Sequence, residues 1–151
     1  MKVLRQGKDI VNIEITSNQE LKSFKSRNPE LTPAFIYLES NGECYPDEKW
    51  VDNPAVILGW WVYSYLDILK GGVGQGICFM EGAFDIDAVV DGNNITLKSE
   101  DGAISWIVSK EELGKALLKA LNKASCLFYE MELEDIADGF NETAKLVRES
   151  M

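Results

Sequence analysis

The segment from 77 to 108 constrains the fold most, because its apolar residues tend to recur at every second position. This period is typical of strands with one buried face, and it predicts four short strands at 77–80, 83–90, 94–98 and 103–108. Asp91-Gly92 and Asp101-Gly102 are dipeptides of the kind that close hairpins. Strands joined by such short turns must run antiparallel. We therefore expect an antiparallel meander in the second half of the chain.

A helix is expected before this meander, at 54–69. This stretch is apolar on nearly every side and rich in tryptophan and tyrosine, which predicts a buried helix packed on more than one side. The capping residue Asn53 followed by Pro54 predicts its start. Gly71 predicts its end, because glycine is the usual residue just beyond a helix C-terminus.

Two further helices are expected after the meander. Ser109 and Glu112 have the spacing of a capping box, in which the serine side chain satisfies the first turn of a helix. Apolar residues then recur at helical spacing over 113–128, and a second such pattern runs over 133–147.

The first third of the chain holds two weaker strand patterns, at 11–15 and 34–38, and a short helix pattern at 18–25. Asn41-Gly42 is a turn dipeptide after the second strand. With 151 residues, one domain covering 1–151 is expected. The elements together predict an α+β domain in which an antiparallel sheet packs against helices on one face.

Charge restricts the possible partners. The formal net charge is -10, while residues 1–27 carry a local excess of three positive charges. Such a surface repels phosphates and attracts basic protein, so binding of nucleic acid is not expected. The run from 130 to 142 carries six carboxylates and no basic residue.

The acidic run contains a stripe that predicts a partner-binding surface. The stripe consists of carboxylates four residues apart, which would share one face of a continuous helix: Glu130, Glu134, Asp138 and Glu142. Asp135 lies beside this stripe. Like charges at this spacing repel, and a basic partner would relieve the repulsion. The alternative is a solvated helix face of an acidic protein.

Asp85 and Asp87 form a second acidic candidate, because alternate residues of a strand point to the same side. The two carboxylates are candidates to receive lysine or arginine from a partner. They are also compatible with a solvated strand face, a cation site or an acid/base pair. The calcium-loop pattern is not met, since Val89 stands where a third ligand is required.

No motif predicts catalysis, a metal or another cofactor. The chain has no histidine, and its three cysteines are too widely spaced for a zinc site. We expect three reduced thiols in or near the core. The glycine-rich segment 71–76 follows a helix and precedes a strand, the reverse of a phosphate-binding loop, so a flexible connector is expected. The four tryptophans are expected in the core, and an exposed one would be a binding hot-spot candidate.

Targeting features are also missing from the sequence. The basic start of the chain leads into no apolar segment, so we expect no signal peptide and a cytoplasmic protein. The most apolar stretch, at 54–69, is too short and too polar to span a membrane.

The chain resembles the small acidic immunity proteins of bacterial toxin–immunity systems, including contact-dependent growth inhibition and polymorphic toxins. The resemblance lies in the size, the α+β layout and three local features: the Trp-rich helix at 55–69, the Phe79-Met80-Glu81-Gly82 junction, and the helix opening from Ser109 to Leu113. The resemblance implies a cytoplasmic inhibitor that binds one cognate toxin, often a basic nuclease. Because the sequence holds no closed set of metal ligands, we separately expect a monomer or weak dimer that folds without metal. The competing hypotheses are a small enzyme of unknown chemistry and a regulatory or self-assembling interaction module.

Overall fold

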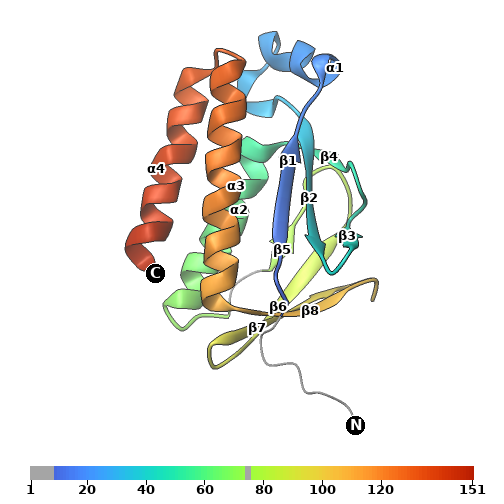
Figure 1. Ribbon diagram of the computed structural model, residues 1–151, viewed down its shortest axis with the longest axis vertical. Coiled ribbons are helices and arrows are strands. Elements are labelled where there is room, and N and C mark those ends of the chain that lie inside the picture. Colours follow the sequence, from blue (N-terminus) through green and yellow to red (C-terminus); the bar gives the residue numbers. More distant parts are fainter. Residues whose placement is uncertain (1–8, 74–75) are drawn as a thin grey trace.

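Two four-stranded antiparallel sheets and three long helices make up the described part of the fold in the computed structural model (Figure 1). The structure describes residues 9–73 and 76–151. The expectations for the basic segment 1–8 and for Gly74 and Gln75 of the glycine connector lie outside the described residues. The α+β class predicted from the sequence is confirmed.

The first sheet is built around a central strand, β2. Its strands are β1 (Asn12–Thr16), β2 (Ala34–Ser40), β3 (Glu43–Tyr45) and β4 (Val51–Asp52). β1 pairs with one edge of β2, and the short strands β3 and β4 pair with the other. Asn41 and Gly42 form the turn into β3 with φ values of 53° and 84°, and positive φ at both residues is typical of a type I′ hairpin. β1 and β2 were predicted, whereas β3 and β4 are too short to produce a recognisable alternation.

The second sheet is the predicted meander. Its strands are β5 (Ile77–Cys78), β6 (Asp85–Asp91), β7 (Asn94–Ser99) and β8 (Ser105–Ser109), paired antiparallel in chain order. Gly92 and Gly102 have φ values of 60° and 78° in the turns that follow β6 and β7, as the two turn dipeptides predicted. β5 and β6 are shorter than expected, because residues 79–84 form a loop between them.

Asp9 connects the two sheets. Its backbone N–H donates to the carbonyl oxygen of Ile107 in β8 at 3.0 Å, and its carboxylate accepts the Ile107 N–H at 2.8 Å. The same carboxylate accepts from the Asn41 side chain, in the turn of the first sheet, at 2.9 Å. The Asp9 side chain is buried, so these bonds are shielded from water.

The helices form a layer beside the sheets. They are α1 (Gln19–Lys22), α2 (Pro54–Leu69), α3 (Lys110–Glu130) and α4 (Glu134–Ser150), with 3-10 turns η1 (Ser23–Ser26) and η2 (Pro29–Leu31). α3 and α4 form an antiparallel hairpin, α3 packs on β1, and α2 contacts both helices (Figure 1). The predicted capping box is confirmed at its serine, whose Oγ accepts the Glu112 N–H at 3.0 Å.

Large aromatic side chains fill the core, and their polar ends are satisfied. Trp61 is buried on α2 and donates from Nε1 to the Cys78 carbonyl oxygen at 2.8 Å. The Tyr65 hydroxyl, also buried, donates to the Lys110 carbonyl oxygen at 2.7 Å. α2 is therefore fixed both to the second sheet and to the start of α3.

The start of α2 differs from the prediction in one respect. The helix begins at Pro54 as expected, but the Asn53 side chain makes no capping hydrogen bond. Its amide instead donates to Glu81 Oε1 at 3.3 Å and approaches Met80 Sδ at 3.6 Å. Tertiary partners thus compete successfully for a side chain that local sequence assigns to the helix end.

The cysteines are free thiols, but not all of them lie near the core. Cys44 and Cys78 are half-buried, whereas Cys126 is exposed on α3. The expectation of three core-associated thiols is therefore wrong for Cys126, whose position in α3 faces water.

Candidate functional site

An open groove with four carboxylates lies where the end of α3 meets the start of α4. Its volume is about 620 Å³. We call it the acidic groove, and it is lined by Glu30, Glu132, Glu134 and Asp135 together with Asn28, Pro29, Leu133 and Ile136. Its walls come from η2, from the corner between the two helices, and from the first turn of α4.

The corner between α3 and α4 is a Schellman motif. The Glu132 N–H donates to the Tyr129 carbonyl oxygen at 2.9 Å, and the Leu133 N–H donates to the Phe128 carbonyl oxygen at 2.9 Å. Glu132 occupies the left-handed position of this motif with φ 62°. Glycine is the usual residue there, because a side chain in this conformation costs roughly 1–2 kcal/mol. The glutamate is thus conformationally unfavourable and places a carboxylate in the groove.

Glu134 and Asp135 have a structural role in addition to lining the groove. Both lie in the first turn of α4, and the residue that precedes this helix, Leu133, makes no side-chain cap. Carboxylates near a helix N-terminus typically contribute about 0.3–1 kcal/mol each by interacting with the helix dipole. Their position is therefore partly explained by helix stability, which is not true of Glu132, since it lies between the two helices.

Two lysines hold the α1–η2 segment against the corner. Lys25 donates from Nζ to the Met131 carbonyl oxygen at 2.9 Å, across more than one hundred residues of sequence. Lys22 lies 4.0 Å from the Glu130 carboxylate. These contacts fix the wall that carries Glu30 relative to the wall that carries the other three carboxylates.

The carboxylates of the acidic groove are uncompensated. Within residues 9–73 and 76–151, no ion pair or hydrogen bond involves the side chains of Glu30, Glu132, Glu134 or Asp135. Glu30, Glu132, Glu134 and Asp135 are all exposed. Negative charges from three segments therefore converge on one hollow, and no basic side chain of the described residues forms an ion pair with these four carboxylates.

The predicted helical stripe is divided by this corner. Glu130 ends α3 and is paired with Lys22, so it does not continue the face of α4. Asp138 accepts the hydroxyl hydrogen of Tyr129, and this hydrogen bond is the main reason that the pKa of Tyr129 is raised. Glu142 is exposed one turn further along α4. The structure thus brings Glu134 and Asp135 together with Glu30 and Glu132, and not with Glu130.

Asp85 and Asp87 lie on the outer side of β6, as the alternation predicted, with Ile86 buried beneath them. Asp85 is half-buried and hydrogen-bonded to the Cys78 thiol. Asp87 is exposed and pairs in register with Lys98 of β7. These two carboxylates have neighbours of their own, and neither lines the acidic groove.

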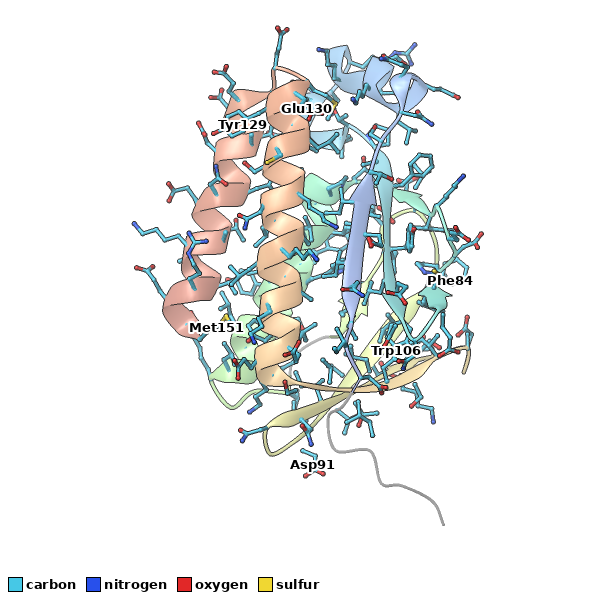
Figure 2. All side chains as sticks on the ribbon, in the orientation of Figure 1. Phe84, Asp91, Trp106, Tyr129, Glu130 and Met151 are labelled. Atoms are coloured by element: carbon cyan, nitrogen blue, oxygen red, sulfur yellow. The ribbon has the colours of Figure 1, made fainter. Side chains whose placement is uncertain are left out.

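Neither Asp85 nor Asp87 lines the acidic groove. Figure 2 places Asp91, at the end of β6, far from Tyr129 and Glu130 at the other end of α3. A helix of 21 residues is about 30 Å long. The end of β6 at Asp91 is therefore remote from the acidic groove, whereas Asp85 begins the strand directly after the 79–84 loop.

Among the tryptophans, Trp61 and Trp106 are buried as expected, while Trp60 on α2 is 47% exposed. Tyr63, one turn further along the same helix, is 81% exposed. Trp60 is therefore the exposed tryptophan that the sequence analysis named as a hot-spot candidate.

No group of three or more His, Cys, Asp or Glu side chains in 9–73 and 76–151 could hold a metal ion. None of the helices in these ranges combines the length and apolar character needed to cross a bilayer.

Glu30 is the residue of the acidic groove that sequence reasoning missed. It lies about one hundred positions from its groove partners, between two proline-containing turns, and no local pattern marks it. Glu132 was counted in the acidic run but lies off the predicted stripe. Its position two residues beyond the end of α3 becomes informative only when the helix end is known.

Comparisons with protein-family models, curated proteins and solved structures found no match to this chain.

Proposed function

We propose that this protein is a cytoplasmic immunity protein that binds and inhibits a cognate basic toxin domain, a nuclease, through its acidic groove. The observation that carries the proposal is the convergence of four uncompensated carboxylates on one open groove. Lysine and arginine side chains of a partner would fill the groove and relieve the repulsion among these carboxylates.

The net charge supports the same class of partner. At -10, the protein attracts a basic domain over distances comparable to the Debye length, about 8 Å at physiological ionic strength. Such attraction raises the association rate more than it raises the final affinity. An inhibitor that must reach a toxin before the toxin reaches its substrate benefits from fast association.

The conformation of Glu132 favours a binding role over a purely solvated surface. A glycine at this position would relieve the left-handed strain and end α3 equally well. Strained residues concentrate at functional sites, and here the strained residue supplies a carboxylate to the groove.

Inhibition follows from the chemistry of the proposed partner. A nuclease binds a phosphate backbone with a basic surface. Carboxylates arranged along a groove present acceptors for the same lysine and arginine side chains. The immunity protein would therefore occupy the basic surface that the toxin uses for nucleic acid, acting as a monomer or weak dimer.

The first step of the test is to ask whether a neighbouring gene encodes a basic toxin domain, and the second is co-expression of this protein with that domain. We expect cells that express the toxin domain to survive only when this protein is present, and a complex with a catalytically inactive toxin to form in solution. Binding should weaken as salt rises. Failure both to protect the cells and to form a complex would reject the proposed function.

A further inference from the structure

A second hollow adjoins the acidic groove. Its volume is about 330 Å³, and it shares Asn28 with the acidic groove. We call it the apolar groove, and its apolar walls are Phe24, Leu31, Pro33, Val51 and Met80. Asn53, Glu81 and Arg27 complete the lining.

Three of these apolar side chains are unusually open to solvent. Phe24, Leu31 and Met80 are 41%, 40% and 40% exposed, although they come from three separate segments. Apolar side chains gathered around one hollow provide area that a partner can remove from water. Methionine is suited to this role because its flexible thioether adapts to different side chains.

The groove is held in place by a buried carboxylate. Asp52 is fully buried, and its Oδ2 accepts the backbone N–H groups of Met80 and Glu81, each at 3.1 Å. Trp50 donates from Nε1 to the same oxygen at 3.0 Å. The loop that carries Met80 is therefore fixed to β4 before any partner arrives, which lowers the entropy cost of binding.

The charges around the two grooves select the class of occupant. Five carboxylates line the joined grooves: Glu30, Glu132, Glu134 and Asp135 in one, and Glu81 in the other. Among the described residues that line the two grooves, one is basic: Arg27, in the apolar groove. The excess of negative charge favours a basic segment and disfavours a second copy of this acidic chain.

We infer that the apolar groove binds a bulky apolar side chain of the same basic toxin segment whose lysine and arginine side chains enter the acidic groove. This inference rests on the proposed function and adds to it the chemistry of the recognised segment: an apolar anchor with basic neighbours. The carboxylates attract the segment and raise its association rate, while the apolar anchor provides specificity. A basic segment without an apolar side chain would leave water in the apolar groove and so bind less tightly.

The experiment uses two short synthetic peptides of lysine and arginine, one with a central phenylalanine and one with serine in its place. Their affinities for the full chain are measured by fluorescence anisotropy. We expect the phenylalanine peptide to bind about tenfold more tightly. In the double variant Leu31→Ser and Met80→Ser this advantage should disappear, while the affinity of the serine peptide stays unchanged.

Val89→Ser is the matched control, because Val89 is a 60% exposed apolar residue on β6 that lines neither groove. It should preserve the advantage of the phenylalanine peptide. Because Leu31 and Met80 are exposed, we expect the variants to have the same melting temperature as the parent. If the double variant does not fold, the single variants Leu31→Ser and Met80→Ser are compared with the parent instead.

The outcomes separate the inference from the proposed function. Equal binding of both peptides to the parent, or an advantage that survives in the double variant, would overturn the inference alone. Peptide binding that is unchanged when Glu30, Glu132, Glu134 and Asp135 are replaced by their amides would overturn the role of the acidic groove in the proposed function. Failure of both peptides to bind would overturn both.

Discussion

Glu132 donates its backbone N–H to the Tyr129 carbonyl oxygen at 2.9 Å while holding a left-handed φ of 62°. This contact ends α3 in a conformation that glycine adopts at lower cost. Glu132→Gly should therefore stabilise the protein by about 0.5–1 kcal/mol in urea unfolding. The same substitution should weaken binding of a basic partner.

Glu132→Gln is the matched variant, because it keeps the strained side chain and removes only the charge. It should leave the free energy of unfolding within about 0.5 kcal/mol of the parent and weaken binding as Glu132→Gly does. A destabilised glycine variant would show that the glutamate side chain contributes to folding.

The adjacent tryptophans of α2 should respond differently to truncation. Trp61 is 1% exposed and hydrogen-bonded to Cys78, so Trp61→Ala should cost about 3–5 kcal/mol in the free energy of unfolding. Trp60 is 47% exposed, and Trp60→Ala should cost much less, about 1 kcal/mol. Chemical denaturation of both variants tests this, and equal losses would contradict the packing of α2 described here.

Asp52 should be essential for the loop that carries Met80. In Asp52→Asn, one of the two carboxylate oxygens becomes an amide nitrogen that faces N–H donors instead of accepting from them. Leaving buried donors without an acceptor should cost about 2–3 kcal/mol in the free energy of unfolding. Ser150→Ala, which removes an exposed hydrogen bond from the serine hydroxyl to the Leu146 carbonyl oxygen, is the comparison and should cost less.

Alkaline pH should destabilise the protein. Burial, and then the hydrogen bond with Asp85, raise the pKa of the Cys78 thiol to about 11 from 9.0. Burial is also the main cause that raises the pKa of Tyr65 to about 12 from 10.0. The unfolded chain therefore releases these protons at lower pH than the folded chain does, so the stability present below about pH 9 falls as the pH rises through the window from 9 to 12.

Urea unfolding at several pH values across this window measures the effect. Cys78→Ser, which removes the thiol, should lose less stability than the parent between about pH 9 and pH 11. Stability that stays constant up to pH 11 in the parent would show that the Cys78 thiol is not protected from ionisation.

Elements with strong local signals were predictable from the sequence. The bounds of α2 follow from Pro54 and Gly71, and the meander follows from its alternation and turn glycines. β3 and β4 have three and two residues, and tertiary pairing with β2 forms them without any periodic pattern of their own. Asn53 likewise exchanges its local capping role for contacts with the 79–84 loop.

The candidate site was predictable only in part. Glu134 and Asp135 were identified because they lie in a dense acidic run. Glu30 joins them because η2 packs beside the corner of α3 and α4, a contact across about one hundred residues that no sequence pattern records. The stripe was drawn on one continuous helix, but the helix is interrupted at Glu132. This residue adopts a left-handed backbone conformation, and because it is not glycine the sequence gives no sign of the break.

The most direct test of the acidic groove compares two variants with the same total charge. One replaces the four groove carboxylates by their amides: Glu30→Gln, Glu132→Gln, Glu134→Gln and Asp135→Asn. The other replaces four exposed carboxylates elsewhere: Glu48→Gln, Asp87→Asn, Asp91→Asn and Glu100→Gln.

The measurement is the affinity of each for the inactive toxin domain at low and physiological salt. We predict that the groove variant loses at least about 100-fold in affinity while the other variant stays within about tenfold of the parent. Equal losses, or a larger loss in the second variant, would contradict the assignment of binding to the acidic groove.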